Sequence, residues 1–182
     1  MYSSDAAPVK GAINLLKNYA VGDRSFLRAD LEKADLRGIT LTGVDLSSAN
    51  LHEANLTGIS LRNVNLAEAK LMGVNLRDAY LKNVSLSHAD LTGANLIGAN
   101  LRGVDLSGSR LGGTNLKETY FKDVNFSQAK MIGTAFSGAK FVGVDFSQAN
   151  LSEAYWKGAI YDVNTRFPEG FDPVKAGMQK AE

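Results

Sequence analysis

The sequence predicts an all-β fold in which the chain coils into a four-sided parallel β-helix. Three observations predict it: a large apolar residue at every fifth position from Phe26 to Trp156, a longer period of twenty, and 18 glycines against 3 prolines. A period of five fits neither an α-helix nor an alternating strand, because apolar side chains at that spacing would spiral around either element. It fits a coil in which each five-residue unit forms one side and turns a corner.

Each unit places a small residue two positions before its large apolar residue, with a polar residue, often Asn or Asp, between them. Residues at i and i+2 of an extended chain point the same way, so both are expected to face inward. Among the small positions, valine recurs at every twentieth residue from Val44 to Val144, whereas neighbouring columns have a different character. Four units, and therefore four sides, make one coil.

The glycines and prolines fit the same geometry. Glycine occupies the last slot of many units, as at Gly58 and Gly93, where a tight corner needs a positive φ. Asn63, Asn83 and Asp123 fill equivalent slots and tolerate that conformation next best. The prolines, at 8, 168 and 173, lie outside the array, where they interrupt no backbone rung.

Stretches such as ANLTG (54–58), ADLTG (89–93) and ANLIG (94–98) resemble the A(D/N)LXX motif of the pentapeptide-repeat family over about three quarters of the chain. The resemblance implies a right-handed quadrilateral β-helix of about 6.75 coils. At a strand spacing of about 4.8 Å, the rod is roughly 32 Å long. Residues 26–159 are assigned to this β-helix, 1–25 to an N-terminal cap with a short helix, and 160–182 to a C-terminal cap or tail.

A solenoid needs caps, because its first and last coils have open edges and apolar ends. Residues 8–20 are predicted to form a short helix over the first coil, with Ile13, Leu16 and Ala20 on one face and Val9 nearby.

The C-terminal end allows two interpretations. Tyr161, Trp156, Phe167 and Phe171 can cover the last coil, or the last three can form an end-to-end homodimer contact, as the C-terminal end does in some relatives. The Arg-Phe-Pro-x-Gly-Phe-Asp-Pro tail at 166–173 is similar to tails of cyanobacterial members, which implies a bacterial, cyanobacterial source.

One surface column carries positive charge throughout. The residues that follow four successive centres of one side form what we call the basic column: Arg62, Lys82, Arg102 and Lys122. A spacing of twenty stacks them about 4.8 Å apart. This column is either a binding site for an acidic protein surface or a phosphate polymer, or a run of solubilising charge. On a neighbouring side Arg37, Arg77, Lys117 and Lys157 recur at intervals of forty.

Little in the sequence points to catalysis, and no catalytic, cofactor-binding or metal-binding residue is predicted. The chain has no cysteine, which excludes disulfides, thiol catalysis and cysteine-ligated zinc. Its histidines, His52 and His88, fall on adjacent sides almost two coils apart, too far to share a metal. Ser87, His88 and Asp90 are chain neighbours that point apart. We therefore expect a protein that is not an enzyme and uses no cofactor.

The sequence predicts a non-catalytic scaffold that presents flat β-helix faces to an unidentified protein partner. Some family members act on DNA gyrase as DNA mimics, so a modulator of a type II topoisomerase is an alternative. The array's 14 Lys and Arg against 13 Asp and Glu argue against mimicry, and the formal net charge of +1 disfavours nucleic acid as partner. With no apolar run of membrane-spanning length and no signal-peptide pattern, we expect a cytoplasmic monomer or end-to-end homodimer without membrane contact.

Overall fold

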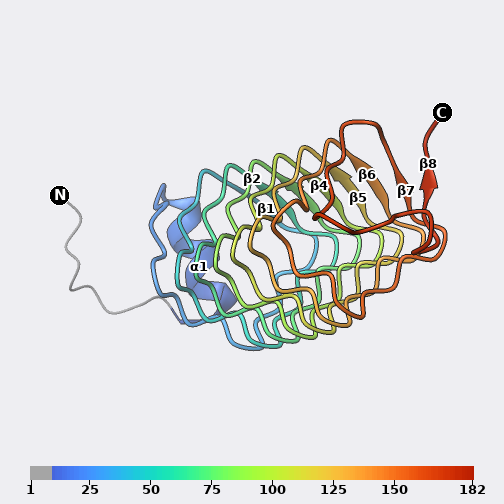
Figure 1. The fold of residues 1–182 in the computed structure, drawn as a ribbon. Coiled ribbons are helices and arrows are strands. Elements are labelled where there is room, and N and C mark those ends of the chain that lie inside the picture. Colours follow the sequence, from blue (N-terminus) through green and yellow to red (C-terminus); the bar gives the residue numbers. More distant parts are fainter. Residues whose placement is uncertain (1–9) are drawn as a thin grey trace.

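The computed structural model describes residues 10–182, in which the chain winds into a parallel β-helix with a helix at one end (Figure 1). Equivalent residues of neighbouring coils are twenty apart, as in the pairing of Leu41 with Leu61 and of Leu61 with Leu81. The coil makes about seven turns. The fold class and the period of twenty are confirmed.

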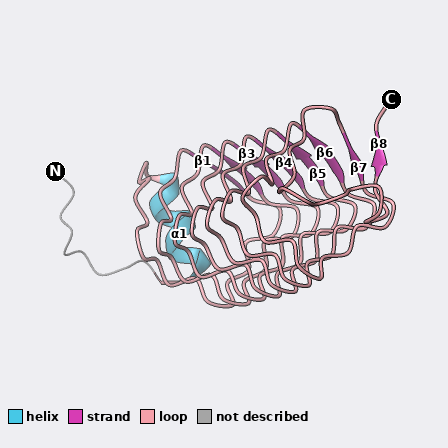
Figure 2. Cartoon of the chain, in the orientation of Figure 1, coloured by secondary structure: helices cyan, strands magenta, loops and turns pink. Residues whose placement is uncertain are grey.

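One side of the coil carries every strand of the described residues, as the magenta segments in Figure 2 show. We call this side the strand face. Each strand pairs in parallel with the next along the chain. In order they are β1 (Thr40–Thr42), β2 (Ser60–Arg62), β3 (Tyr80–Lys82), β4 (Asn100–Arg102), β5 (Tyr120–Lys122), β6 (Lys140–Val142), β7 (Ile160–Tyr161) and β8 (Gln179–Lys180).

The other three sides are held by single bridges, such as Asp45 to Asn65, rather than by strands. Their turns close with a local hydrogen bond, as where the Ala49 N–H donates to the Leu46 carbonyl over 3.1 Å. On the strand face the chain stays extended for three residues instead, in the pattern outward, inward, outward. The strand face is therefore the one continuous sheet surface of the described coil.

The corners confirm the predicted backbone conformation. Gly58 and Gly93 have φ values of +65° and +68°, and Asn83 and Asp123 both have +53°. Charged residues also occupy this slot with positive φ, for example Glu118 at +58°. The corner thus imposes the left-handed conformation on nearly every residue that stands there, with Gln148 an exception, although only glycine adopts it without steric cost.

The interior is filled by the two inward residues of each unit. The central Leu and Phe side chains and their small partners form one continuous buried cluster. From Phe121 onward Phe replaces Leu at most centres, and the rings stack between coils, with centroids 5.1 Å apart for Phe121 and Phe141. Where the small residue is polar it is satisfied: the Thr114 hydroxyl donates to the Leu91 carbonyl over 2.7 Å. No buried side-chain nitrogen or oxygen in residues 10–182 lacks a partner.

Helix α1 (Gly11–Ala20) covers the first coil, as predicted, but with a different face. Leu15 is fully buried, with Ala12 and Tyr19 packed beside it, whereas Ile13 is 70 % exposed. The predicted face of Ile13, Leu16 and Ala20 is wrong, because Leu15 and Tyr19 pack on the coil instead; Ile13 and Ala20 are exposed and Leu16 is half-buried. The Tyr19 hydroxyl also accepts a 3.1 Å hydrogen bond from the Thr42 N–H.

The predicted contribution of Val9 lies outside the described residues. None of the helices within residues 10–182 has the length and apolar character needed to cross a membrane.

At the opposite end, the register continues past residue 159. Strand β7 pairs with β6, and after a loop the short strand β8 pairs with β7. The spacing then departs from twenty, because Arg166 pairs with Asp145, 21 residues away, and Gln179 pairs with Ile160, 19 residues away. Phe167 stacks on Phe146 with ring centroids 5.7 Å apart, so the tail supplies aromatic contacts to the last complete coil.

Candidate interaction surface

The basic column runs along the strand face at the outward position that ends strands β2 to β5. In the parallel register Arg62 lies opposite Lys82, Lys82 opposite Arg102, and Arg102 opposite Lys122. All four side chains are exposed. The structure therefore brings together the four residues that the sequence placed in one column.

Aromatic rings support the two arginines of the column. The guanidinium carbon of Arg62 lies 5.0 Å from the centroid of the Tyr80 ring, and that of Arg102 lies 5.2 Å from the centroid of Tyr120. Such cation–π contacts hold the planar guanidinium against the sheet. Arg102 is fixed further by a 2.9 Å hydrogen bond from its Nε to the Asn100 carbonyl oxygen Oδ1.

No carboxylate of the described residues lies within ion-pair distance of any member of the basic column. Four arginines on other parts of the surface are paired instead: Arg37 with Asp35, Arg77 with Asp78, Arg110 with Asp90, and Arg166 with Asp145. The contrast means that the positive charge of the strand face is uncompensated locally, whereas arginine charge elsewhere is largely compensated.

These pairs also alter carboxyl acidity. Burial alone raises the pKa of Asp90, but hydrogen bonds from Thr92 and Arg110 outweigh it and leave the pKa below its ordinary value. The pKa of Asp145 is lowered in the same way, with burial opposed by hydrogen bonds from Ser147 and by Arg166. Both carboxylates are therefore held in the charged form by their neighbours.

A shallow depression of about 300 Å³ lies beside the column. Its lining residues are Tyr80, Lys82, Asn83, Arg102, Gly103, Lys122 and Asp123. The corner at Gly103 has no side chain, and a Cβ there would stand 2.8 Å from Asn83 Oδ1. Three cations thus border a hollow on an otherwise flat sheet.

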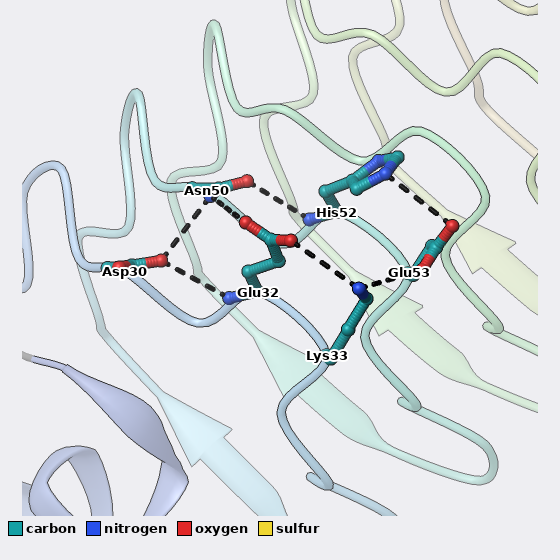
Figure 3. Close-up of polar contacts among 6 residues, drawn as sticks. All are labelled: Asp30, Glu32, Lys33, Asn50, His52 and Glu53. Carbon is teal, nitrogen blue, oxygen red and sulfur yellow. Dashed lines mark hydrogen bonds and ion pairs between the residues drawn. The ribbon is translucent and has the colours of Figure 1, made fainter.

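A second polar group lies on a different side of the first coils (Figure 3). Lys33 Nζ is 3.6 Å from Glu53 Oε2 and 3.8 Å from Glu32 Oε1, and His52 Nε2 is 3.6 Å from Glu53 Oε1. Asn50 donates to both Asp30 and Glu32 over 3.3 Å. Because these groups bind one another, the cluster is a self-contained surface network.

The catalytic arrangements considered for the histidines do not form. His88 is exposed and lies against the corner at Gly108, while the Asp90 carboxylate accepts hydrogen bonds from Thr92 and Arg110. Ser87 Oγ lies 3.2 Å from Ser85 Oγ. Within the part of the chain that the structure describes, no three His, Asp or Glu side chains gather as metal ligands.

The C-terminal aromatic residues lie together at the end of the coil. Trp156 is buried and contacts Phe171 edge to face at 5.6 Å, and Phe171 stacks on Phe167 at 5.2 Å. Next to them, a depression of about 520 Å³ lies between residues 149–152 and 168–171. Trp156 is covered by its own tail, while Phe167 and Phe171 remain partly accessible.

The period of twenty in the sequence places the basic column, but it does not indicate that the four cations lack carboxylate partners. The column of Arg37 and Arg77 was a comparable candidate, yet each of these arginines pairs with a carboxylate one or two residues away. The Asp35-x-Arg37 spacing was a readable signal, since i and i+2 share a face of an extended chain. The stacking of Arg62 on Tyr80 depends on side-chain rotamers, for which the sequence carries no comparable signal.

Comparisons with known proteins agree with this geometry. A family model described as "Pentapeptide repeats (8 copies)" matches residues 25–63, 59–98, 69–108, 99–138 and 119–155. No curated protein matches the sequence.

Among solved structures, trypsin-treated QnrB1, a plasmid-mediated fluoroquinolone resistance protein, superposes with a TM-score of 0.77 at 19 % identity, covering 86 % of this chain and 81 % of that one. At this identity the likeness shows the fold alone.

Two proteins from Nostoc PCC 7120 are similar in sequence. The pentapeptide repeat protein alr5209 is 28 % identical over 97 % of this chain and 100 % of its own, with a TM-score of 0.37. HetL, involved in heterocyst differentiation regulation, is 25 % identical over 93 % of this chain and 92 % of its own, with a TM-score of 0.34.

Proposed function

We propose, starting from the fact that this chain belongs to the pentapeptide-repeat family, that it is a non-catalytic scaffold whose flat β-helix faces bind a protein partner. The observation that carries the proposal is the filled interior. One buried apolar cluster extends through the coil, so any recognition takes place on the outer faces.

The outer faces suit recognition of a macromolecule better than catalysis. The depressions on them are shallow and open, whereas small-molecule sites are concave and enclose most of their ligand. The sides instead present columns of side chains in fixed register, as between β2 and β5. A flat, ordered surface of this kind fits a protein partner.

The stacked coil also supplies rigidity. Each coil is hydrogen-bonded to the next on every side, for example from the Leu66 N–H to the Ser85 carbonyl and from the Leu71 N–H to the Asp90 carbonyl. A solenoid whose repeats all contact their neighbours loses little conformational entropy on binding, which favours affinity.

Photo-crosslinking on each side of one coil tests the proposal. A photoreactive amino acid is placed in turn at four outward positions, one per side: Ser127, Ile132, Ser137 and Val142. We expect protein adducts from one or two adjacent sides in extracts of the source organism, identified by mass spectrometry. Absence of protein adducts from all four sides would contradict a scaffold that acts through its faces.

The alternative is a DNA-mimic modulator of a type II topoisomerase. The similarity of fold to QnrB1 is the observation that favours this alternative. Against it, the strand face carries positive charge that no described carboxylate compensates, which is opposite in sign to the charge of DNA. A supercoiling assay with excess protein and purified gyrase distinguishes the two. We expect neither inhibition nor protection from a fluoroquinolone; either effect would favour the alternative.

A further inference from the structure

We infer that the strand face binds an acidic α-helix of a protein partner, which lies along the rod axis with one ridge of carboxylates on the basic column of Arg62, Lys82, Arg102 and Lys122. The inference rests on the proposed scaffold function and names the face and the chemistry of the partner. It depends on three observations: the four cations have no carboxylate partner, their spacing matches a helix, and arginine guanidinium groups cover the neighbouring tyrosine rings.

The cations are available because nothing in the described structure neutralises them. Arg62 and Arg102 lie on tyrosine rings and reach no carboxylate, in contrast to Arg110, whose guanidinium is bound to Asp90. The aromatic contact restricts the arginine side chains before a ligand arrives, so less entropy is lost when a carboxylate binds. Each guanidinium keeps free N–H donors suited to a bidentate carboxylate.

The spacing of the column matches the turns of a helix. Successive column residues belong to adjacent parallel strands about 4.8 Å apart, so the four cations span about 14 Å. Side chains at i, i+4, i+7 and i+11 of an α-helix form one ridge that advances about 5.4 Å per turn. The difference of about 0.6 Å per rung is absorbed by the flexible lysine and arginine stems.

The same surface is poorly suited to nucleic acid. Single-stranded nucleic acids bind on open aromatic rings, but the rings of Tyr80 and Tyr120 are covered by the guanidinium groups of Arg62 and Arg102. The near-neutral chain lacks the strongly basic character of nucleic-acid-binding domains.

The test uses the full chain and three fluorescent probes at low salt. One is an alanine-based helical peptide of about 20 residues with one glutamate per turn on a single ridge. The second has the same composition with its glutamates spread around the helix. The third is an oligothymidylate of similar charge. Fluorescence anisotropy gives the dissociation constants.

The charge-reversed variant is Arg62→Glu, Lys82→Glu, Arg102→Glu and Lys122→Glu. A matched control reverses four exposed lysines on other sides that have no ion pair among the described residues: Lys70→Glu, Lys117→Glu, Lys130→Glu and Lys157→Glu. Both variants have the same net charge. A milder pair, Lys82→Gln with Lys122→Gln against Lys70→Gln with Lys130→Gln, keeps the test valid if charge reversal impairs folding.

We expect the ridge peptide to bind about tenfold more tightly than the dispersed peptide and than the oligothymidylate, and the charge-reversed column to weaken it about tenfold. The matched control should change affinity less than about threefold. Equal binding of the two peptides, equal loss in both variants, or tighter binding of the oligothymidylate would overturn the inference. Any of these results, with protein adducts still formed in the crosslinking experiment, would leave the scaffold function standing.

Discussion

At the corners of the coil, the backbone conformation of a residue determines how well the sequence tolerates change. Gly113 has a φ of +64°, and an added Cβ would meet nothing within 4 Å, so its only cost is the left-handed conformation itself. Its neighbour Gly112 has no positive φ, and a Cβ there would make an ordinary contact of 3.8 Å with the Ile132 carbonyl. Because both sites have room for a methyl group and only Gly113 has a positive φ, the pair isolates the cost of backbone conformation from that of steric contact.

We therefore predict opposite results for alanine at these two positions. Gly113→Ala should lower the free energy of unfolding by about 1–2 kcal/mol, because an L-residue is strained at positive φ. Gly112→Ala should leave it unchanged or raise it by up to about 1 kcal/mol, because alanine restricts the unfolded chain. Urea unfolding followed by circular dichroism measures both. Equal destabilisation would contradict the conformational explanation.

The carboxylate of Asp90 links stability to pH. Its pKa is lowered in the folded protein, since hydrogen bonds from Thr92 and Arg110 outweigh its burial. A carboxyl group of this kind stabilises the fold above its unfolded pKa, and the contribution disappears as pH falls through the folded value.

We predict that Asp90→Asn lowers stability at pH 7 and flattens its decline between about pH 5 and pH 2. Urea midpoints measured across this range give the slope. Arg110→Gln should produce part of the same flattening, and the double variant should show less than the sum of the two losses, because both remove one interaction. Fully additive losses would show that the pair does not act as a unit.

At the scale of elements, contacts with the first coil, and not helical spacing alone, decide which face of the N-terminal helix is buried. Two apolar stripes overlap in α1, one through Ile13 and Leu16 and another through Ala12, Leu15 and Tyr19. Helical spacing alone cannot choose between them. The second stripe is buried because it carries the aromatic residue whose hydroxyl also binds the backbone of β1.

This assignment predicts a difference between two substitutions in the helix. Leu15→Ala should lower the free energy of unfolding by about 2–5 kcal/mol, since it leaves a cavity under the cap. Ile13→Ala, at a position that is 70 % exposed, should change it by less than about 0.5 kcal/mol. Thermal unfolding measures the two. A larger loss of stability for Ile13→Ala than for Leu15→Ala would instead support burial of the face that contains Ile13, Leu16 and Ala20.

Much of the fold could be predicted because repetition multiplies a weak local signal. One unit such as ANLTG says little, but the recurrence from Val44 to Val144 fixed the number of sides and the register. The sequence did not distinguish the strand face from the other three sides, because all four use the same motif. Whether a turn closes with its own hydrogen bond depends on how neighbouring coils stack, which is a tertiary effect.

For the candidate site, too, the sequence predicts the positions of the residues but not their side-chain contacts. The column of Arg62 to Lys122 follows from the period of twenty, since register alone places these residues. Its isolation from carboxylates does not follow, because long side chains choose among several partners within reach. Local spacing accounts for part of the difference, since Arg37 has Asp35 two residues before it and pairs with it, whereas Arg62 has Ser60 at that position.

At the scale of the whole molecule, the two ends of the rod are closed by different means. A helix covers the first coil, whereas the irregular tail covers the last (Figure 1). The tail places Phe167 on Phe146 and Phe171 against Trp156. The tail also supplies the final rung, β8. Without the tail, the last coil would expose the rings of Phe146 and Trp156 and its unpaired backbone groups. Exposed apolar ends and open strand edges promote the association of solenoids.

We predict that a chain truncated after Tyr161 associates, with a weight-average mass in sedimentation velocity that rises with concentration above that of the full chain. The reason is that Phe146 and Trp156 become exposed next to an open strand edge. A second variant, Phe167→Ser with Phe171→Ser in the full chain, separates the two roles open to these rings. If the rings act as a cap, this variant loses stability and does not fall in mass. If they form an end-to-end homodimer contact, its mass falls to half that of the unchanged chain, and the truncated chain is then a monomer as well.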